Sequence, residues 1–96
     1  MNESQVRNKI GPLAARLAAL GVASLSLFGS AAKGTARRDS DLDFLVEFEG
    51  PATFDRYMSL KELLESELHA QIDLVTTRAL KPVLKDQILR EAVRVA

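Results

Sequence analysis

The sequence predicts a mixed α/β domain in which a small β-sheet is flanked by helices. An apolar stripe with helical spacing begins the chain, and two runs with the character of β-strands follow it. Turn residues such as Gly50-Pro51 separate the segments. The expected order is helix, strand, short helix, strand, helix, strand, helix, which is typical of helices packed against a sheet.

The first helix is expected over the N-terminal twenty residues. Its apolar residues recur at steps of four and three and share one face: Val6, Ile10, Leu13, Leu17 and Leu20. Gly11-Pro12 interrupts this stripe, so the helix is either kinked there or restarts with Pro12 in its first turn. Gly21 is expected to cap its C-terminal end.

Two strands are expected next, over 22–28 and 41–48. The first is apolar enough to be a buried strand. In the second, alternate side chains point to opposite faces, with Leu42, Phe44, Val46 and Phe48 on one face and Asp41, Asp43 and Glu47 on the other. Between the two strands, Ala31–Gly34 is expected to form a short helix, followed by a polar, basic loop.

The second half of the chain predicts a helix, a short strand and a last helix. Thr53 is a suitable N-cap for a helix that reaches about His69 and includes Phe54 and Tyr57 on its apolar face. Residues 72–75 have the composition of a short strand. Pro82 suits the first turn of a final helix that continues to Arg94 and Val95.

Composition favours one soluble globular domain over residues 1–96. The net charge of zero gives no bulk attraction to nucleic acid, so direct nucleic-acid binding is not expected. The absence of cysteine excludes a disulfide framework and a cysteine-based zinc site. No apolar run has the length of a membrane span or the pattern of a signal peptide, so the cytoplasm is the expected location.

Gly29-Ser30 and Asp41-x-Asp43 are the residues that indicate chemistry. Asp41 and Asp43 lie on one face of a strand with Cα atoms roughly 6.6 Å apart, at about 3.3 Å per residue. Like charges so close repel unless a cation lies between them, and hard cations prefer carboxylate oxygens. A Gly-Ser turn before a helix offers backbone N–H groups to a phosphate. Together they indicate phosphoryl or nucleotidyl transfer.

Each of these residues also has a purely structural interpretation. Asp41 could close the preceding turn, and Asp73, inside the third strand, could pair with an arginine. Gly29-Ser30 could be an ordinary turn in which the serine caps the next helix. Asp43 is the hardest to explain in this way, because aspartate is depleted in strands and is costly to bury without a partner.

These residues resemble the signature of the nucleotidyltransferase superfamily, which includes polymerase-β-like enzymes, and are most similar to its minimal branch, the MntA-type antitoxins. That signature is Gly-Ser, ten residues, Asp-x-Asp, and a third Asp on a later strand. Here it is met by Gly29-Ser30, Asp41, Asp43 and Asp73. Lys33 stands where the family often has Arg, which keeps the charge but loses the planar fork.

The resemblance implies a nucleotidyltransferase fold, ATP as substrate and two Mg²⁺ ions as cofactors. It implies that Asp41 and Asp43 are metal ligands, with Asp73 as a third ligand or the proton acceptor. Gly29 and Ser30 would bind the triphosphate, and Lys33 and Arg37 could assist or could belong to a solvated loop.

The resemblance also implies a partner. MntA-type proteins transfer AMP to a tyrosine of a HEPN-type ribonuclease toxin, which is encoded beside them and forms a complex with them. An antitoxin that acts by adenylylation is therefore expected. Two alternatives remain open: a non-catalytic antitoxin that blocks its partner stoichiometrically, and a nucleotidyltransferase for small molecules. An oligomer is plausible because small domains often expose apolar helix faces.

Overall fold

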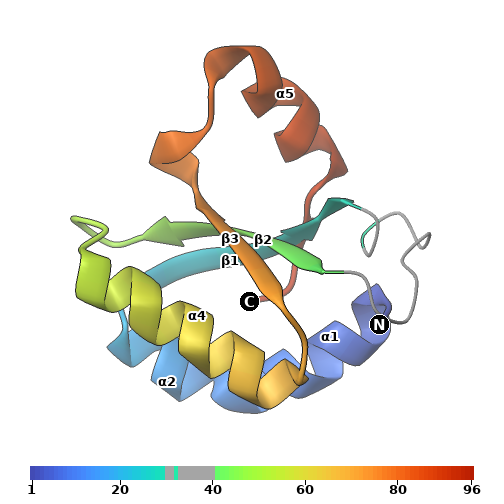
Figure 1. Ribbon diagram of the computed structural model, residues 1–96, viewed down its shortest axis with the longest axis vertical. Coiled ribbons are helices and arrows are strands. Elements are labelled where there is room, and N and C mark those ends of the chain that lie inside the picture. Colours follow the sequence, from blue (N-terminus) through green and yellow to red (C-terminus); the bar gives the residue numbers. More distant parts are fainter. Residues whose placement is uncertain (30–31, 33–40) are drawn as a thin grey trace.

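The fold is built on a four-stranded mixed sheet with the strand order β3-β2-β1-β4 (Figure 1). The computed structural model describes residues 1–29, 32 and 41–96. β1 pairs antiparallel with both β2 and β4, whereas β2 pairs parallel with β3. The strand bounds are Val22–Phe28 for β1, Leu42–Phe48 for β2, Ile72–Thr76 for β3 and Val93–Arg94 for β4.

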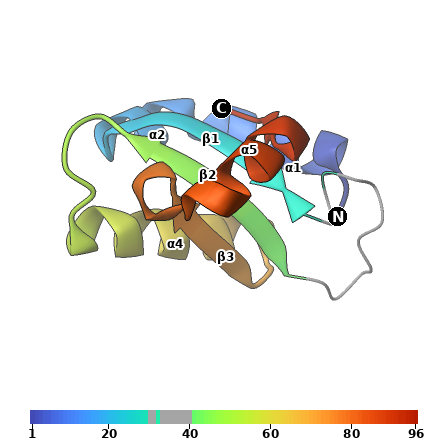
Figure 2. The same ribbon diagram turned by 90° about the horizontal axis from the view of Figure 1, so that it is seen from above.

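Helices lie on both sides of this sheet. Helices α1, α2 and α4 cover one face, and α5 lies on the opposite side (Figures 1 and 2). The bounds are Glu3–Ile10 for α1, Ala14–Ala19 for α2, Phe54–Leu68 for α4 and Pro82–Glu91 for α5, with 3₁₀ turns η1 at Gly11–Leu13 and η2 at Thr77–Ala79. None of the helices in the described ranges has both the length and the apolar character needed to cross a bilayer.

The interruption of the first helix is confirmed. The chain passes from α1 through the 3₁₀ turn at Gly11–Leu13 into α2, with Pro12 in the first turn of the new segment. Gly21 follows α2 with a φ of +78°, the left-handed conformation in which glycine carries no steric penalty. The start of α1 is fixed by a capping box, in which Asn2 and Gln5 exchange side-chain to backbone hydrogen bonds of 2.9 and 3.0 Å.

The hydrophobic core lies between the sheet and the layer of α1, α2 and α4. It contains the predicted stripe of the first helix and the predicted inner face of β2. Its fully buried members include Val6, Ile10, Leu25, Leu27, Leu42, Phe44, Val46, Leu60, Leu64 and Leu68. Because Leu42, Phe44 and Val46 point into this core, the intervening residues of β2 point to the other face of the sheet.

The end of the chain and part of α4 differ from the expectation. The last helix ends at Glu91 instead of continuing to Val95, and residues 93–94 pair with Leu27 and Ser26 of β1. This pairing satisfies the outer edge of β1 and lets Val95 pack against the core. Phe54 is 76% exposed, because it lies at the first position of α4, before the helix reaches the sheet. Of the predicted helix at Ala31–Gly34, only Ala32 is among the described residues, and it packs against the core.

Helix α4 is capped and attached to β3 by polar contacts. Thr53 Oγ1 accepts the backbone N–H of Arg56 at 3.2 Å, and His69 ends the helix in the left-handed conformation with a φ of +51°. The Tyr57 hydroxyl donates to the carbonyl oxygen of Leu74 at 2.6 Å. Since β3 is at the edge of the sheet, this bond satisfies a backbone group that β2 does not reach.

The substitution Tyr57→Phe is expected to lower the free energy of unfolding by about 1 kcal/mol. Phenylalanine keeps the ring and its packing but leaves the Leu74 carbonyl oxygen without its side-chain donor. Urea unfolding measured by circular dichroism should show a lower midpoint with an unchanged slope. An unchanged midpoint would mean that water replaces the hydroxyl without cost.

Candidate active site

Asp43 and Asp73 are direct neighbours across the parallel β2–β3 pair. Both point to the sheet face opposite the core, since Leu42, Phe44 and Leu74 are buried on the inner face. Asp43 is half-buried and Asp73 is exposed, and their carboxyl groups are close enough to share a hydrogen bond. The strand register therefore brings together two carboxylates that are thirty residues apart in the sequence.

Asp43 is the group on which this arrangement acts most strongly. Partial burial raises the pKa of Asp43, the negative charge and the hydrogen bond of Asp73 raise it further, and the charge of Asp41 adds to this effect. The anionic form of Asp43 is thus disfavoured in the metal-free protein. A bound cation would remove this penalty, as would a proton.

Gly29 directly follows β1 and lies beside Asp43. Its φ of +72° lies in the left-handed region, and a Cβ atom at this position would overlap the Asp43 Oδ2 atom. Glycine is therefore required twice, once by the backbone conformation and once by the approach of the carboxylate. Phe28, the cross-strand partner of Asp43, is a neighbour that was not predicted, and its position just before Gly29-Ser30 in the sequence was the available signal.

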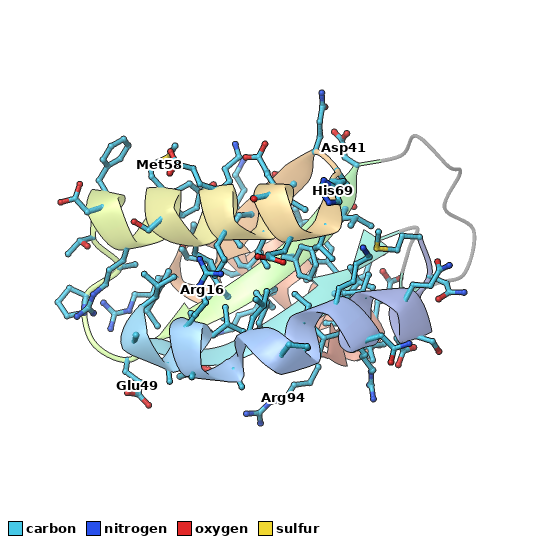
Figure 3. The ribbon with its side chains drawn as sticks, turned by 90° about the horizontal axis from the view of Figure 1, so that it is seen from below. Arg16, Asp41, Glu49, Met58, His69 and Arg94 are labelled. Atoms are coloured by element: carbon cyan, nitrogen blue, oxygen red, sulfur yellow. The ribbon has the colours of Figure 1, made fainter. Side chains whose placement is uncertain are left out.

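Asp41 precedes β2 and is exposed at the end of the sheet (Figure 3). Its charge reaches Asp43, so the structure brings Asp41, Asp43, Asp73 and Gly29 into one region. Ser30, Lys33 and Arg37 lie outside the described residues, and their predicted contacts with a triphosphate remain predictions from the sequence.

The donor set fits Mg²⁺ better than a metal that needs a complete protein shell. Within residues 1–29, 32 and 41–96, no group of three acidic, histidine or cysteine side chains is arranged to hold an ion alone. Mg²⁺ is commonly bound through one or two carboxylates, with waters and substrate phosphates as its other ligands. The Asp43–Asp73 pair, with its oxygen donors on the sheet face opposite the core, has this character.

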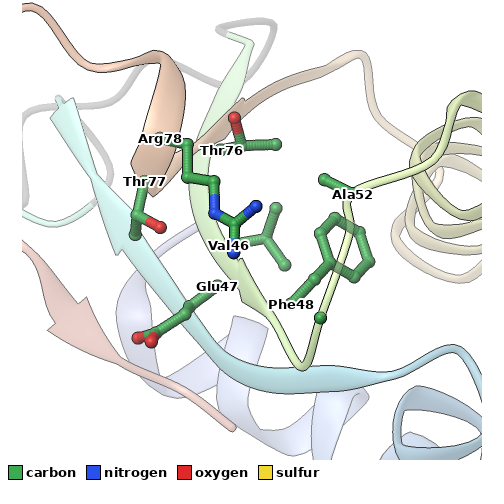
Figure 4. Close-up of a pocket in the computed structure, with 8 residues that line it drawn as sticks. Val46, Glu47, Phe48, Ala52, Thr76, Thr77 and Arg78 are labelled. Atoms are coloured by element: carbon green, nitrogen blue, oxygen red, sulfur yellow. The ribbon is translucent and has the colours of Figure 1, made fainter.

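A small hollow lies toward the end of β2 opposite to Asp43. It is lined by Val46, Glu47, Phe48, Gly50, Ala52, Thr76, Thr77 and Arg78 (Figure 4). Its volume of about 70 Å³ holds only a few water molecules. It is therefore too small for a nucleotide, and its lining includes neither Asp43 nor Asp73.

The raised pKa of Asp43 predicts how the free energy of unfolding depends on pH when EDTA keeps the protein free of metal. Because the folded protein binds this proton more tightly than the unfolded chain, Asp43 lowers the free energy of unfolding as the pH rises through its folded pKa. We expect Asp43→Asn to be more stable than the wild type at pH 7, and the difference to vanish below the ordinary aspartate pKa. Thermal unfolding at both pH values measures it, and a difference independent of pH would contradict the assignment.

Comparisons with known proteins point in one direction. The family model described as nucleotidyltransferase domain matches residues 12–95. A proposed protein adenylyltransferase of Methanocaldococcus jannaschii is 42% identical over 96 residues, which cover 99% of this chain and 99% of that protein. Protein adenylyltransferase MntA of Thermococcus cleftensis is 40% identical over 75 residues, which cover 78% of this chain and 76% of that protein.

Two solved structures share the fold. A proposed minimal nucleotidyltransferase matches with a TM-score of 0.84 and 40% identity, covering 97% of this chain and 95% of the other. A toxin–antitoxin structure with AMP-PNP matches with a TM-score of 0.75 and 29% identity, covering 94% of this chain and 72% of the other.

Proposed function

Because the chain belongs to the nucleotidyltransferase family, we propose that it is a protein adenylyltransferase that acts as an antitoxin. In this proposal it transfers AMP from ATP to a tyrosine of a HEPN-type ribonuclease toxin. The observation that carries the proposal is the Asp43–Asp73 pair beside Gly29, on a sheet face that the core helices leave uncovered. The similarity to MntA and to a toxin–antitoxin structure with AMP-PNP supports the substrate and the partner.

The roles of the residues follow from their charge and position. Asp41 and Asp43 would hold two Mg²⁺ ions together with phosphate oxygens of ATP, and Asp73 would be a further ligand or the proton acceptor. When bound, Mg²⁺ neutralises phosphate charge and makes an attacking hydroxyl more acidic. Gly29 leaves room for the Asp43 carboxylate. We assign triphosphate binding to Gly29 and Ser30, assisted by Lys33 and Arg37.

The reaction is a displacement at the α-phosphorus of ATP. The tyrosine oxygen forms the new P–O bond, the bond to the bridging oxygen breaks, and pyrophosphate leaves. The proton of the tyrosine hydroxyl passes to Asp73 or to water. The product carries an anionic phosphodiester, which repels the phosphates of an RNA substrate if it lies near the binding site of the ribonuclease.

The test uses the HEPN-type protein that the proposal expects to be encoded beside this chain. Incubation of the two proteins with ATP and Mg²⁺ should increase the intact mass of the HEPN-type protein by one or more AMP units, and EDTA should prevent the increase. Peptide mapping would then identify the modified residue. A stable complex without any mass increase would overturn the proposal.

A binding antitoxin is the second candidate, favoured by the apolar side chains that α5 leaves exposed. The two candidates differ in their need for the carboxylates. If neutralisation requires AMP transfer, the Asp41→Asn/Asp43→Asn variant should fail to neutralise the toxin. If neutralisation occurs by occlusion, the same variant should still neutralise it. Growth of cells that express the toxin together with this variant distinguishes the two.

A further inference from the structure

Helix α5 contributes no buried side chain to the core. Every residue from Pro82 to Glu91 is exposed or only half-buried, although the segment contains four large aliphatic side chains. Three of the four large hydrophobic residues that are exposed in the described ranges lie on this helix: Val83 at 82%, Leu84 at 47% and Leu89 at 48%. The helix therefore presents apolar surface to water, which is unfavourable by about 25 cal/mol per Å².

The chain nevertheless holds α5 in a defined place. Its N-terminal end follows β3 and η2, and its C-terminal end leads into β4, which pairs with β1. Backbone hydrogen bonds of 2.9 to 3.1 Å join Leu25 of β1 to Val95 and Ala96 and hold the segment after α5 against the sheet. The helix is thus tied to the sheet at both ends, while its exposed side chains remain available for a partner.

The position of α5 relates it to the carboxylates. It lies on the side of the sheet opposite α1, α2 and α4 (Figures 1 and 2), and this is the side to which Asp43 and Asp73 point. A protein held on α5 would therefore stand on the same face as the reacting groups. A partner held on α1, α2 or α4 would be separated from those groups by the whole sheet.

The charges around the apolar side chains indicate the character of that protein. The segment from η2 through α5 carries four cations, Arg78, Lys81, Lys85 and Arg90, and two carboxylates, whereas the whole chain is neutral. Among the described residues, no ion pair includes Arg78, Lys81 or Lys85. A surface that combines apolar side chains with carboxylates complements this segment.

We propose that α5 is the docking surface for the protein that accepts AMP, to which it offers the exposed side chains of Val83 and Leu89 together with those of Lys81 and Lys85. This inference rests on the proposed function, because it assumes a protein acceptor. The acceptor surface that it predicts combines apolar side chains with Asp and Glu and lies next to the hydroxyl that is modified.

The test compares two sets of exposed hydrophobic residues. The double variant Val83→Gln/Leu89→Gln removes apolar surface from α5, and glutamine preserves the helix because it is a good helix former. The control Phe54→Gln makes the same kind of change on α4, where Phe54 is 76% exposed. Binding of the HEPN-type protein is measured by calorimetry without nucleotide, and AMP transfer by intact mass. The α5 variant should weaken binding and raise the KM for the acceptor at least about tenfold, with MgATP affinity unchanged. Phe54→Gln should leave all three quantities unchanged.

The outcomes separate this inference from the proposed function. If the α5 variant binds more weakly but neither the wild type nor the variants transfer AMP, the proposed activity is refuted and the docking surface stands. Equal binding by the wild type and the α5 variant, or equal losses with Phe54→Gln, would overturn the docking surface. Self-association of the wild type that the α5 variant abolishes, with acceptor binding unchanged, would instead assign the surface to a second copy of the chain.

Discussion

Asp43→Asn is expected to reduce AMP transfer about a thousandfold while the fold is retained. Asparagine keeps the size of the side chain but removes the charge that holds a metal ion, and metal-ion catalysis supplies several kcal/mol of transition-state stabilisation. Three factors of ten correspond to about 4 kcal/mol. The initial rate of acceptor modification at saturating ATP and Mg²⁺, followed by mass spectrometry, measures the loss.

Glu47→Gln is the matched control for this substitution. Glu47 lies on the same strand and the same sheet face as Asp43, and it is likewise changed to its amide, but it has no predicted role in the chemistry. We expect its activity to equal that of the wild type. Full activity in Asp43→Asn, or equal losses in the two variants, would refute the assignment of Asp43 to the active site.

Gly29→Ala is expected to reduce activity about 100-fold and to destabilise the fold. Alanine in the left-handed conformation costs about 1–2 kcal/mol, and its Cβ atom would also displace the Asp43 carboxylate. A displacement of about 1 Å in a reacting group can lower a rate by roughly two orders of magnitude. The loss should therefore exceed that expected from backbone strain alone.

Gly50→Ala separates these two contributions. Gly50 has a similar φ of +81°, but a Cβ atom there would meet no other atom within 4 Å. This variant should show the conformational destabilisation and retain wild-type activity. Chemical unfolding and the AMP-transfer rate, measured for both variants, make the comparison. If Gly29→Ala behaves like Gly50→Ala in both measurements, the contact between Gly29 and Asp43 has no catalytic consequence.

The elements with local signals were predicted well. β1 was expected over 22–28 and is found there, and the caps at Thr53 and Pro82 begin their helices as expected. These features depend on φ preferences, side-chain caps and the alternation of neighbouring residues, all of which lie within a few positions of the chain. Gly29, Asp41, Asp43 and Asp73 were selected by motif spacing, and their catalytic roles remain predictions. The family that this spacing resembles is confirmed.

The features that depend on distant segments were not predicted. Val93 and Arg94 were expected in a helix, yet they form β4. The edge of β1 provides their backbone hydrogen-bond partners, and β1 lies too far away in the sequence to be recognised from the residues around Val93. The exposure of Val83 and Leu89 was not predicted either. An amphipathic pattern identifies an apolar helix face but does not show whether another part of the chain covers that face.

The pairing of Asp43 with Asp73 depends on both the local sequence and the tertiary structure. The sequence identifies both carboxylates and places each on a strand. Their adjacency requires that β2 and β3 run parallel in one particular register, because a shift by one residue would turn Asp73 toward the core. That register is set by the burial of Leu42, Phe44, Ile72 and Leu74 against α1, α2 and α4. Hydrophobic packing on one face of the sheet thus positions the charges on the other.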